Sequence, residues 1–299
     1  VVDANDPPVI ADAAFTIDEN VANLTAVGTM DSSDPDVADT LTHVIDAGNS
    51  GGAFQITAAG ELQVLNAPGL NFELTSSYVL TVRVNDNGAP SLSDTASITV
   101  TVNDVNEAPV VANATYTVDE DAANGTQVAT LNVTEEDSGQ SLAHIISSGN
   151  GSGAFTLNVN TGRITVADTS LIDFELTPTY VLTVNVVDNG TPSLSDTATI
   201  TINVNNVNEA PVALDQTFTI LETAIATAAV GNVGASDPDP GQTLAYNITA
   251  GNTNTAFAID GAGNISVNNA TDFEATSVYV LSLDITDNGG VVGPAPPIT

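Results

Sequence analysis

Short acidic motifs recur three times along the chain, in the same order each time. Each copy has an acidic or Asn-rich linker ending in proline, a glutamate after its first apolar segment, two carboxylates two positions apart, an Asx-Phe-Glu triplet and an Asp-Asn-Gly turn. Calcium takes about six to eight hard oxygen ligands in loose geometry, from Asp, Glu, Asn and backbone carbonyls. The motifs therefore predict calcium sites.

The linker motif sets the period of the chain. It begins at Asp3, Asp104 and Asn206, which lie 101 and then 102 positions apart. Such fixed self-similarity indicates tandem copies of one unit, and a unit of this length can bury its own core. We therefore expect three domains, over residues 1–103, 104–205 and 206–299.

Composition excludes several classes of function. The chain has 37 acidic and two basic residues, a net charge of −35, which argues against nucleic acid or an anionic membrane surface as a partner. Cysteine is absent, so disulfides and thiolate metal sites are excluded. A hydrophobic content of 42% favours a folded chain over a disordered one. No apolar run approaches the roughly 18 residues of a membrane span, so no insertion is expected in this segment.

Apolar residues alternate with polar ones, as in half-buried antiparallel strands. Segments 78–84, 180–186 and 279–283 share this pattern, as do 98–102 and 200–204. About seven short strands per hundred residues, separated by Asn-Gly turns, predict an all-β sandwich with Greek-key connections. We expect one aromatic anchor in each core, at Phe54, Phe155 and Phe257.

At the C-terminus, only Ile298 and Thr299 match the final strand of the first copy, so we expect that strand of the third copy to be incomplete. The N-terminal Val1 and Val2 read as the end of such a strand. The chain is therefore expected to lie end to end with identical or similar repeats, as a filament or as one period of a longer polypeptide.

The ordered set of motifs resembles the cadherin repeat in its bacterial form, and it does so three times over almost the whole chain. The resemblance implies an immunoglobulin-like architecture, three β-sandwiches in an elongated rod, and calcium at each junction with ligands split between neighbouring domains. Each junction offers seven carboxylates and two Asn side chains, which suits about two or three Ca²⁺ ions with bridging ligands.

Carried over residue by residue, the resemblance implies three sets of ligands. The first junction takes Glu19, Asn71, Glu73, Asp104, Asn106, Glu107, Glu135, Asp137 and Asp188. The second takes Glu120, Asp173, Glu175, Asn206, Asn208, Glu209, Asp237, Asp239 and Asp287. Two complementary half-junctions remain at the ends, Asp3, Asn5, Asp6, Asp34, Asp36 and Asp86 in the first copy and Glu222, Asp272 and Glu274 in the third.

Four positions depart from the family pattern. Asn71 and Asn206 stand where the family has aspartate, and Glu107 and Glu209 stand where aspartate is usual. These departures are expected to weaken or reshape the shell of one ion without abolishing the site.

Other interpretations compete with calcium at single positions. Acidic residues in β-turns are usually solvated, although the registered set favours calcium. His43 and His144 share their repeat position with Tyr246, which indicates packing in a strand rather than catalysis. Paired carboxylates also occur in glycosidases, but three similar sets at domain borders favour a structural role over an enzyme.

We therefore expect a non-enzymatic, extracellular or cell-surface protein, a calcium-rigidified segment of an adhesive stalk or head-to-tail fibre. Its expected partners are neighbouring repeats of the same or a similar kind. The alternative is a calcium-dependent recognition module that binds another surface protein or a polysaccharide through a sandwich face. The absence of Trp disfavours an aromatic sugar platform.

Overall fold

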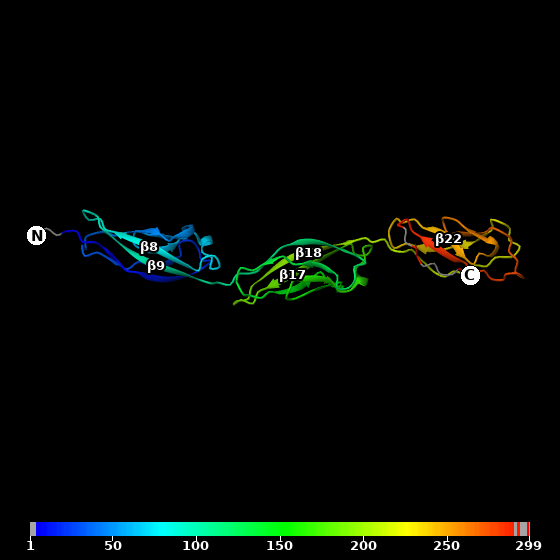
Figure 1. Ribbon diagram of the computed structural model, residues 1–299, viewed down its shortest axis with the longest axis horizontal. Coiled ribbons are helices and arrows are strands. Elements are labelled where there is room, and N and C mark those ends of the chain that lie inside the picture. Colours follow the sequence, from blue (N-terminus) through cyan, green and yellow to red (C-terminus); the bar gives the residue numbers. More distant parts are fainter. Residues whose placement is uncertain (1–3, 290–291, 294–297, 299) are drawn as a thin grey trace. The chain divides into compact units, whose positions relative to one another are not determined.

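The computed structural model describes residues 4–289, 292–293 and 298. The described residues form β-strands and short 3-10 turns (Figure 1). By their contacts they divide into two compact units. One holds residues up to Val111 with 132–144 and 185–197, and the other holds 112–131, 145–184 and 198 onward.

The first repeat is a sandwich of two main sheets. The larger sheet has the strand order β2-β9-β8-β5, the smaller has the order β3-β7-β6, and β1 pairs with β4. The elements are β1 (Val9–Ile10), β2 (Ala13–Asp18), β3 (Ala26–Thr29), β4 (Ser32–Ser33), β5 (Thr42–Ala47), η1 (Ser50–Gly52), β6 (Phe54–Ile56), β7 (Glu61–Val64), η2 (Ala67–Gly69), β8 (Ser77–Asn85) and β9 (Ser93–Asn103).

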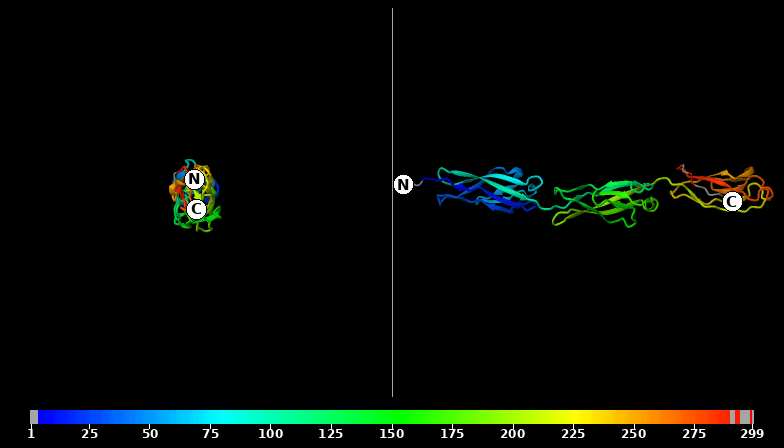
Figure 2. Two further views of the ribbon diagram at one scale, coloured as in Figure 1. Left: turned by 90° about the vertical axis from the view of Figure 1, so that its right-hand side faces the viewer. Right: turned by 60° about the horizontal axis from the view of Figure 1, so that its bottom comes forward.

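The core of the first repeat follows the predicted alternation. On β8 and β9 every second side chain is buried, including Tyr78, Leu80 and Val100. Phe54 packs edge-on against Tyr78, with ring centroids 5.1 Å apart, so the predicted aromatic anchor is confirmed. Burying each such side chain stabilises the fold by roughly 1.5–3 kcal/mol. β8 and β9 lie side by side along the repeat, in cyan (Figure 1), and the right-hand view of Figure 2 shows them from another side.

One strand pairing differs from the antiparallel pattern that the sequence predicts. β2 runs parallel to the second half of β9, from Ala13 opposite Ile98 to Asp18 opposite Asn103. The chain pairs first with β4, through β1, and then crosses to the larger sheet, where it runs in the direction of β9. The crossing brings the ends of β2 and β9 to one end of the sandwich, so the residues that follow both strands are neighbours.

The second repeat has the same strand orders, β11-β18-β17-β14 and β12-β16-β15, with β10 paired to β13. Again the first strand of the larger sheet, β11, is parallel to β18. The elements are β10 (Val110–Val111), β11 (Ala114–Asp119), β12 (Gln127–Thr130), β13 (Val133–Thr134), β14 (Ala143–Ser148), β15 (Phe155–Leu157), β16 (Arg163–Val166), η3 (Thr169–Leu171), β17 (Thr179–Val187) and β18 (Ser195–Asn205).

The third repeat keeps the smaller sheet, β20-β24-β23, but has only β22-β25-β26 in place of the larger one among its described residues. Leu281 and Ile298 form an isolated antiparallel bridge, and Ile298 is the last residue that the structure describes. Val1, Val2 and Thr299, on which the end-to-end expectation rests, lie outside the described residues. The elements are β19 (Val212–Ala213), β20 (Ala229–Asn232), β21 (Ala235–Ser236), β22 (Ala245–Ala250), η4 (Thr253–Thr255), β23 (Phe257–Ile259), β24 (Asn264–Val267), β25 (Ser282–Thr286) and β26 (Val292–Gly293).

The two histidines occupy packing positions, as predicted. His43 and His144 are each only 7% exposed. The His43 ring lies 2.9 Å from Ser32 Oγ through Nε2 and 2.9 Å from the Ala58 carbonyl through Nδ1. Both ring nitrogens of His43 therefore serve the packing between strands.

Candidate metal centres at the repeat junctions

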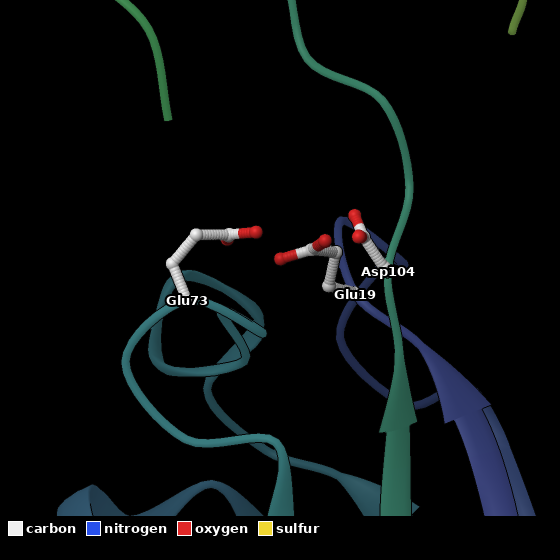
Figure 3. Close-up of side chains that lie close together, drawn as sticks. All are labelled: Glu19, Glu73 and Asp104. Atoms are coloured by element: carbon white, nitrogen blue, oxygen red, sulfur yellow. The ribbon is translucent and has the colours of Figure 1, made fainter. Parts of the chain in front are cut away.

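Three carboxylates of the first repeat converge at the end where β2 and β9 finish. Glu19 follows β2, Asp104 follows β9, and Glu73 lies in the turn after η2. Each offers an oxygen within 4.8 Å of the others. Figure 3 shows the carboxylates of Glu73 and Asp104 on either side of Glu19.

Backbone amides fix the central glutamate of this group. Glu19 is only 2% exposed, and its Oε2 accepts a hydrogen bond from the Phe72 amide at 2.8 Å. Its Oε1 accepts one from the Val105 amide at 2.9 Å. Glu19 therefore ties the 71–73 turn to the linker that follows β9.

A second group overlaps the first and reaches the next repeat. Glu73, Glu107 and Asp137 also bring one oxygen each within 4.8 Å of one another, so Glu73 belongs to both groups. The Glu107 amide donates to Asp137 Oδ2 at 2.9 Å, and the Asp137 amide donates to Glu135 Oε1 at 3.2 Å. All these residues belong to the first compact unit. The linker and the loop after β13 are thus positioned together.

Asn106 anchors the linker on the Asp188 turn. Its Nδ2 donates to Asp188 Oδ2 at 3.1 Å and to the Pro192 carbonyl at 3.0 Å. Its Oδ1 accepts a hydrogen bond from Gln140 Nε2. A Cβ at Gly190 would lie 1.5 Å from Asn106 Oδ1, so the glycine of this turn is required by the close approach of the linker.

Burial, neighbouring charges and hydrogen bonds shift the pKa values of the acidic side chains at the first junction. Burial first, and then the charge of Glu19, raises the pKa of Glu107 to about 7. Burial also raises the pKa values of Glu73, Asp104 and Glu135, with nearby carboxylates adding to the effect. For Asp188, burial would raise the pKa, but hydrogen bonds from Leu194, Asn106 and Gly190 outweigh it and hold the pKa below its ordinary value. A cation beside the first four groups would relieve this cost of ionisation.

A cation site should contain buried oxygen atoms that have no hydrogen-bond partner within the protein. Among the described residues, buried side-chain oxygens without a hydrogen-bond partner are concentrated at these sites. The first junction contributes Glu73 Oε2, Glu107 Oε2, Glu135 Oε2 and Gln140 Oε1, and the second contributes Asp237 Oδ2 and Gln242 Oε1. Buried polar atoms are normally paired, so orphaned oxygens at both junctions fit a bound cation.

The second junction repeats the arrangement with the same number of carboxylates, but its described residues form one three-carboxylate group instead of two overlapping ones. Glu120, Asp173 and Glu175 form its three-carboxylate group. Asn206, at the position of Asp104, donates to Glu175 Oε1 at 3.3 Å instead of adding a charge. The Glu209 amide donates to Asp239 Oδ2 at 2.7 Å, the Asp239 amide donates to Asp237 Oδ1 at 3.0 Å, and Asn208 donates to Asp287 Oδ2 at 2.7 Å.

The half-junctions also gather carboxylates. Glu222, Asp272 and Glu274 form one exposed group, and Asp34 and Asp86 form another with Asp39. Asp36 Oδ2 accepts from the Asp6 amide at 2.7 Å, and Asn5 donates to Asp86 Oδ2 at 3.0 Å. Asp3 lies outside the described residues.

The structure adds one carboxylate, Asp39, to the candidate ligands and shows a second role for Asn71. Sequence reasoning missed Asp39, although it lies five positions after Asp34, where the other copies have Gln140 and Gln242. Asn71 Oδ1 accepts a hydrogen bond from the Leu74 amide at 2.8 Å, so it stabilises its own turn, as Asp173 does with Leu176 at 2.7 Å. Ligation by Asn71 stays a prediction.

Gly190→Ala should loosen the first junction. The added methyl group would displace the Asn106 side chain and break its hydrogen bond to Asp188. We expect calcium affinity at this junction to fall by roughly tenfold, as for other changes to groups that orient metal ligands. Calorimetry measures the effect, with Gly151→Ala as the control because a methyl there meets no atom within 4 Å. Equal affinities for the two variants would contradict this role of Asn106.

Comparison with known proteins identifies the family. The cadherin domain model matches residues 13–103, 114–205 and 216–297. The chain belongs to the cadherin domain family. Human protocadherin Fat 1 is 34% identical over 304 residues, which cover 96% of this chain and 6% of that protein. The Fat-like cadherin-related tumor suppressor homolog of Drosophila melanogaster is 31% identical over 231 residues, 74% of this chain and 5% of that protein. The chain thus spans only a small part of these relatives.

Solved cadherin structures share the fold. Extracellular cadherin domains 1-5 of protocadherin gamma B2 match with a TM-score of 0.70 and 24% identity, over 99% of this chain and 60% of that one. Mouse cadherin-23 EC22-24 matches with a TM-score of 0.66 and 22% identity, over 99% and 98%. These likenesses confirm three tandem β-sandwiches of cadherin type, while the boundaries at 103/104 and 205/206 stay predictions.

Family membership settles several expectations. Cadherin domains are extracellular adhesion modules and not enzymes, so both of these predictions are confirmed. They generally bind Ca²⁺ between repeats. Among the described residues, no helix is long and apolar enough to cross a membrane. The bacterial character of the repeats stays a prediction.

Proposed function

We propose that the chain is a calcium-stiffened segment of an extracellular adhesive rod. The observation that carries this proposal is Glu73, whose carboxylate belongs both to the group with Glu19 and Asp104 and to the group with Glu107 and Asp137. A cation held by these side chains takes ligands from two repeats and from the linker between them. Binding to this ordered arrangement alone stabilises it by mass action.

The side chains themselves account for the calcium dependence. Without a cation, burial and then the repulsion between neighbouring carboxylates disfavour the ionised forms, and both raise the pKa values of Glu73, Asp104 and Glu107. When bound, calcium supplies positive charge and accepts oxygens from several directions. The linker at 104–107 is then held to both neighbouring repeats, which stiffens the chain.

We assign two or three ions to each junction. The seven carboxylates of a junction carry a charge of −7, which about two or three Ca²⁺ ions nearly balance. The ligands assigned at the first junction are Glu19, Asn71, Glu73, Asp104, Asn106, Glu107, Glu135, Asp137 and Asp188, and those at the second are Glu120, Asp173, Glu175, Asn206, Asn208, Glu209, Asp237, Asp239 and Asp287.

The two junctions should differ in affinity, and Asn206→Asp tests this. The first junction has two overlapping carboxylate groups and the second has one, with Asn206 where the first has Asp104. Restoring the aspartate adds a charged ligand, so we expect calcium to bind the second junction roughly tenfold more tightly. Calorimetry on the variant measures this change. Asp104→Asn should weaken the first junction by a similar factor. No change in either variant would refute the proposed difference.

Small-angle scattering tests the rod itself. In calcium, the intact chain should give the profile of a stiff, elongated particle. Removing calcium with a chelator should broaden the distribution of shapes, because the linkers lose their shared ligands. An identical profile in both conditions would rule out the calcium-stiffened rod.

We further propose that the half-junctions meet neighbouring cadherin repeats end to end. The support is their complementary make-up, with Asp34, Asp39 and Asp86 in one group and Glu222, Asp272 and Glu274 in the other. Sedimentation in calcium should show association that increases with concentration and that a chelator reverses. A strictly monomeric chain at high protein and calcium concentrations would overturn this assignment. Recognition through a sandwich face stays a prediction.

A further inference from the structure

One position in each repeat carries a side-chain oxygen close to the Asp-Asn-Gly turn, and it lies outside the ligand sets assigned above. This position is Asp39 in the first repeat, Gln140 in the second and Gln242 in the third. Oε1 of each glutamine is buried and has no hydrogen-bond partner. Buried polar atoms are normally paired, so two orphaned oxygens at the same position point to a partner that binds there.

The backbone holds this position against the Asp-Asn-Gly turn of its own repeat. In all three repeats, the residue that follows the position donates its amide hydrogen to the side chain of the asparagine in that turn. The pairs are Thr40 with Asn87 at 2.7 Å, Ser141 with Asn189 at 2.7 Å, and Thr243 with Asn288 at 2.9 Å. The side chain at the position therefore starts beside the turn that supplies the aspartate ligand.

The side chain of Gln140 reaches the linker between the repeats. Its Nε2 donates to Asn106 Oδ1, and Asn106 Nδ2 donates in turn to Asp188 Oδ2. Gln242 donates to Asn208 in the same way, at 2.7 Å. The amide that carries the orphaned oxygen is thus separated from the aspartate of the turn by a single asparagine side chain.

In the first repeat the position belongs to a carboxylate group. Asp39 brings an oxygen within 4.8 Å of oxygens of Asp34 and Asp86. Asp34 Oδ2 is itself buried without a hydrogen-bond partner, and so are Glu135 Oε2 and Asp237 Oδ2 at the same place in the other repeats. The oxygen of Asp39 therefore shares one centre with two of the assigned ligands, which shows where an oxygen at this position can reach.

We propose that Gln140 and Gln242 each add an amide oxygen to the calcium shell of their junction, through the Oε1 that lacks a partner. This inference rests on the calcium junctions proposed above. Amide and carboxylate oxygens both serve as calcium ligands, and the number of charged ligands tunes the affinity. Each junction already has seven carboxylates. A neutral oxygen completes the shell without further charge, whereas an acidic residue at this position raises the affinity.

Gln140→Glu separates a calcium ligand from a hydrogen-bond donor. As a ligand, the glutamate adds charge to the shell, so calcium should bind the first junction roughly tenfold more tightly. If Gln140 served only to donate to Asn106, the glutamate would lose that N–H and set a carboxylate against Asn106 Oδ1, so affinity would fall. Calorimetry on the full chain measures the sign of the change.

Gln127→Glu is the matched control for this variant. Gln127 is exposed, and its side chain donates to Thr130 within the same strand, β12. The substitution makes the same chemical change away from the linker, so calcium affinity should stay within about twofold of the parent.

Gln140→Met tests the oxygen itself. Methionine has a similar length but offers no hard oxygen, so affinity at the first junction should fall by roughly tenfold. Terbium bound in place of calcium gives a second measurement, because its luminescence lifetimes in H₂O and D₂O count the waters on the bound ions. The variant should gain about one water where the amide oxygen is lost. A residue that only packs would leave the count unchanged.

Two outcomes would overturn the inference. One is weaker calcium binding by Gln140→Glu, and the other is parental affinity and water count in both Gln140 variants. Either result would leave the calcium junctions standing, since the parent would still bind calcium. A parent that bound no calcium would instead refute the junctions themselves, and the glutamine ligands with them.

Discussion

Replacing Glu73 with alanine should weaken calcium binding at the first junction more than the loss of any single charge elsewhere. Glu73 contributes an oxygen to both carboxylate groups, so its removal takes a ligand from two positions at once. We expect affinity at this junction to fall by at least tenfold, and one ion to be lost from the stoichiometry. Calorimetry with calcium on the full chain measures both quantities.

Glu136→Ala is the matched control for this variant. It removes one negative charge from the loop that holds Glu135 and Asp137, but Glu136 is exposed and belongs to none of the carboxylate groups among the described residues. Its calcium binding should stay within about twofold of the parent, because surface charges act weakly through water. If Glu73→Ala and Glu136→Ala bound calcium alike, the shared-ligand role of Glu73 would be wrong.

Phe54→Ala should strongly destabilise the first repeat. Phe54 is 1% exposed and packs edge-on against Tyr78, so its truncation leaves a cavity in the core. Such changes cost about 3–5 kcal/mol of unfolding free energy. Denaturant unfolding of the calcium-free chain, followed by hydrogen exchange in residues 77–103, should show the loss in the first repeat alone.

Phe273→Ala provides the comparison for the core. Phe273 is 62% exposed, so removing its ring should change stability by less than about 1 kcal/mol. Similar losses for the two phenylalanines would contradict the assignment of Phe54 as the anchor of its core.

Much of the fold could be predicted from the alternation of apolar residues. Tyr78, Leu80 and Val82 are buried as the period of two requires, because successive side chains of a strand point to opposite faces. Strand direction could not be predicted in this way. The parallel pairing of β2 with β9 depends on the crossing between sheets, and alternation is the same for parallel and antiparallel neighbours.

The residue types of the candidate site could be predicted from the sequence. Which residue belongs to both carboxylate groups could not. The repeated motifs pointed to Glu19, Asp104 and Asp137, and these lie in the two overlapping groups. That Glu73 belongs to both groups depends on the path of the linker, which no local pattern encodes. Asp39 could have been found from its register with Gln140 and Gln242, but it stands outside the short motifs.

The most direct test of calcium binding at the junctions is a calorimetric titration of the chelator-treated chain, repeated on the double variant Glu73→Ala, Glu175→Ala. Each substitution removes one member of a carboxylate group, one at each junction. We predict that the parent binds more than one Ca²⁺ per junction and that the double variant loses most of this heat, while magnesium gives little, because it holds its waters more tightly. A parent chain that gave no calcium heat, or a double variant that titrated like the parent, would contradict the account.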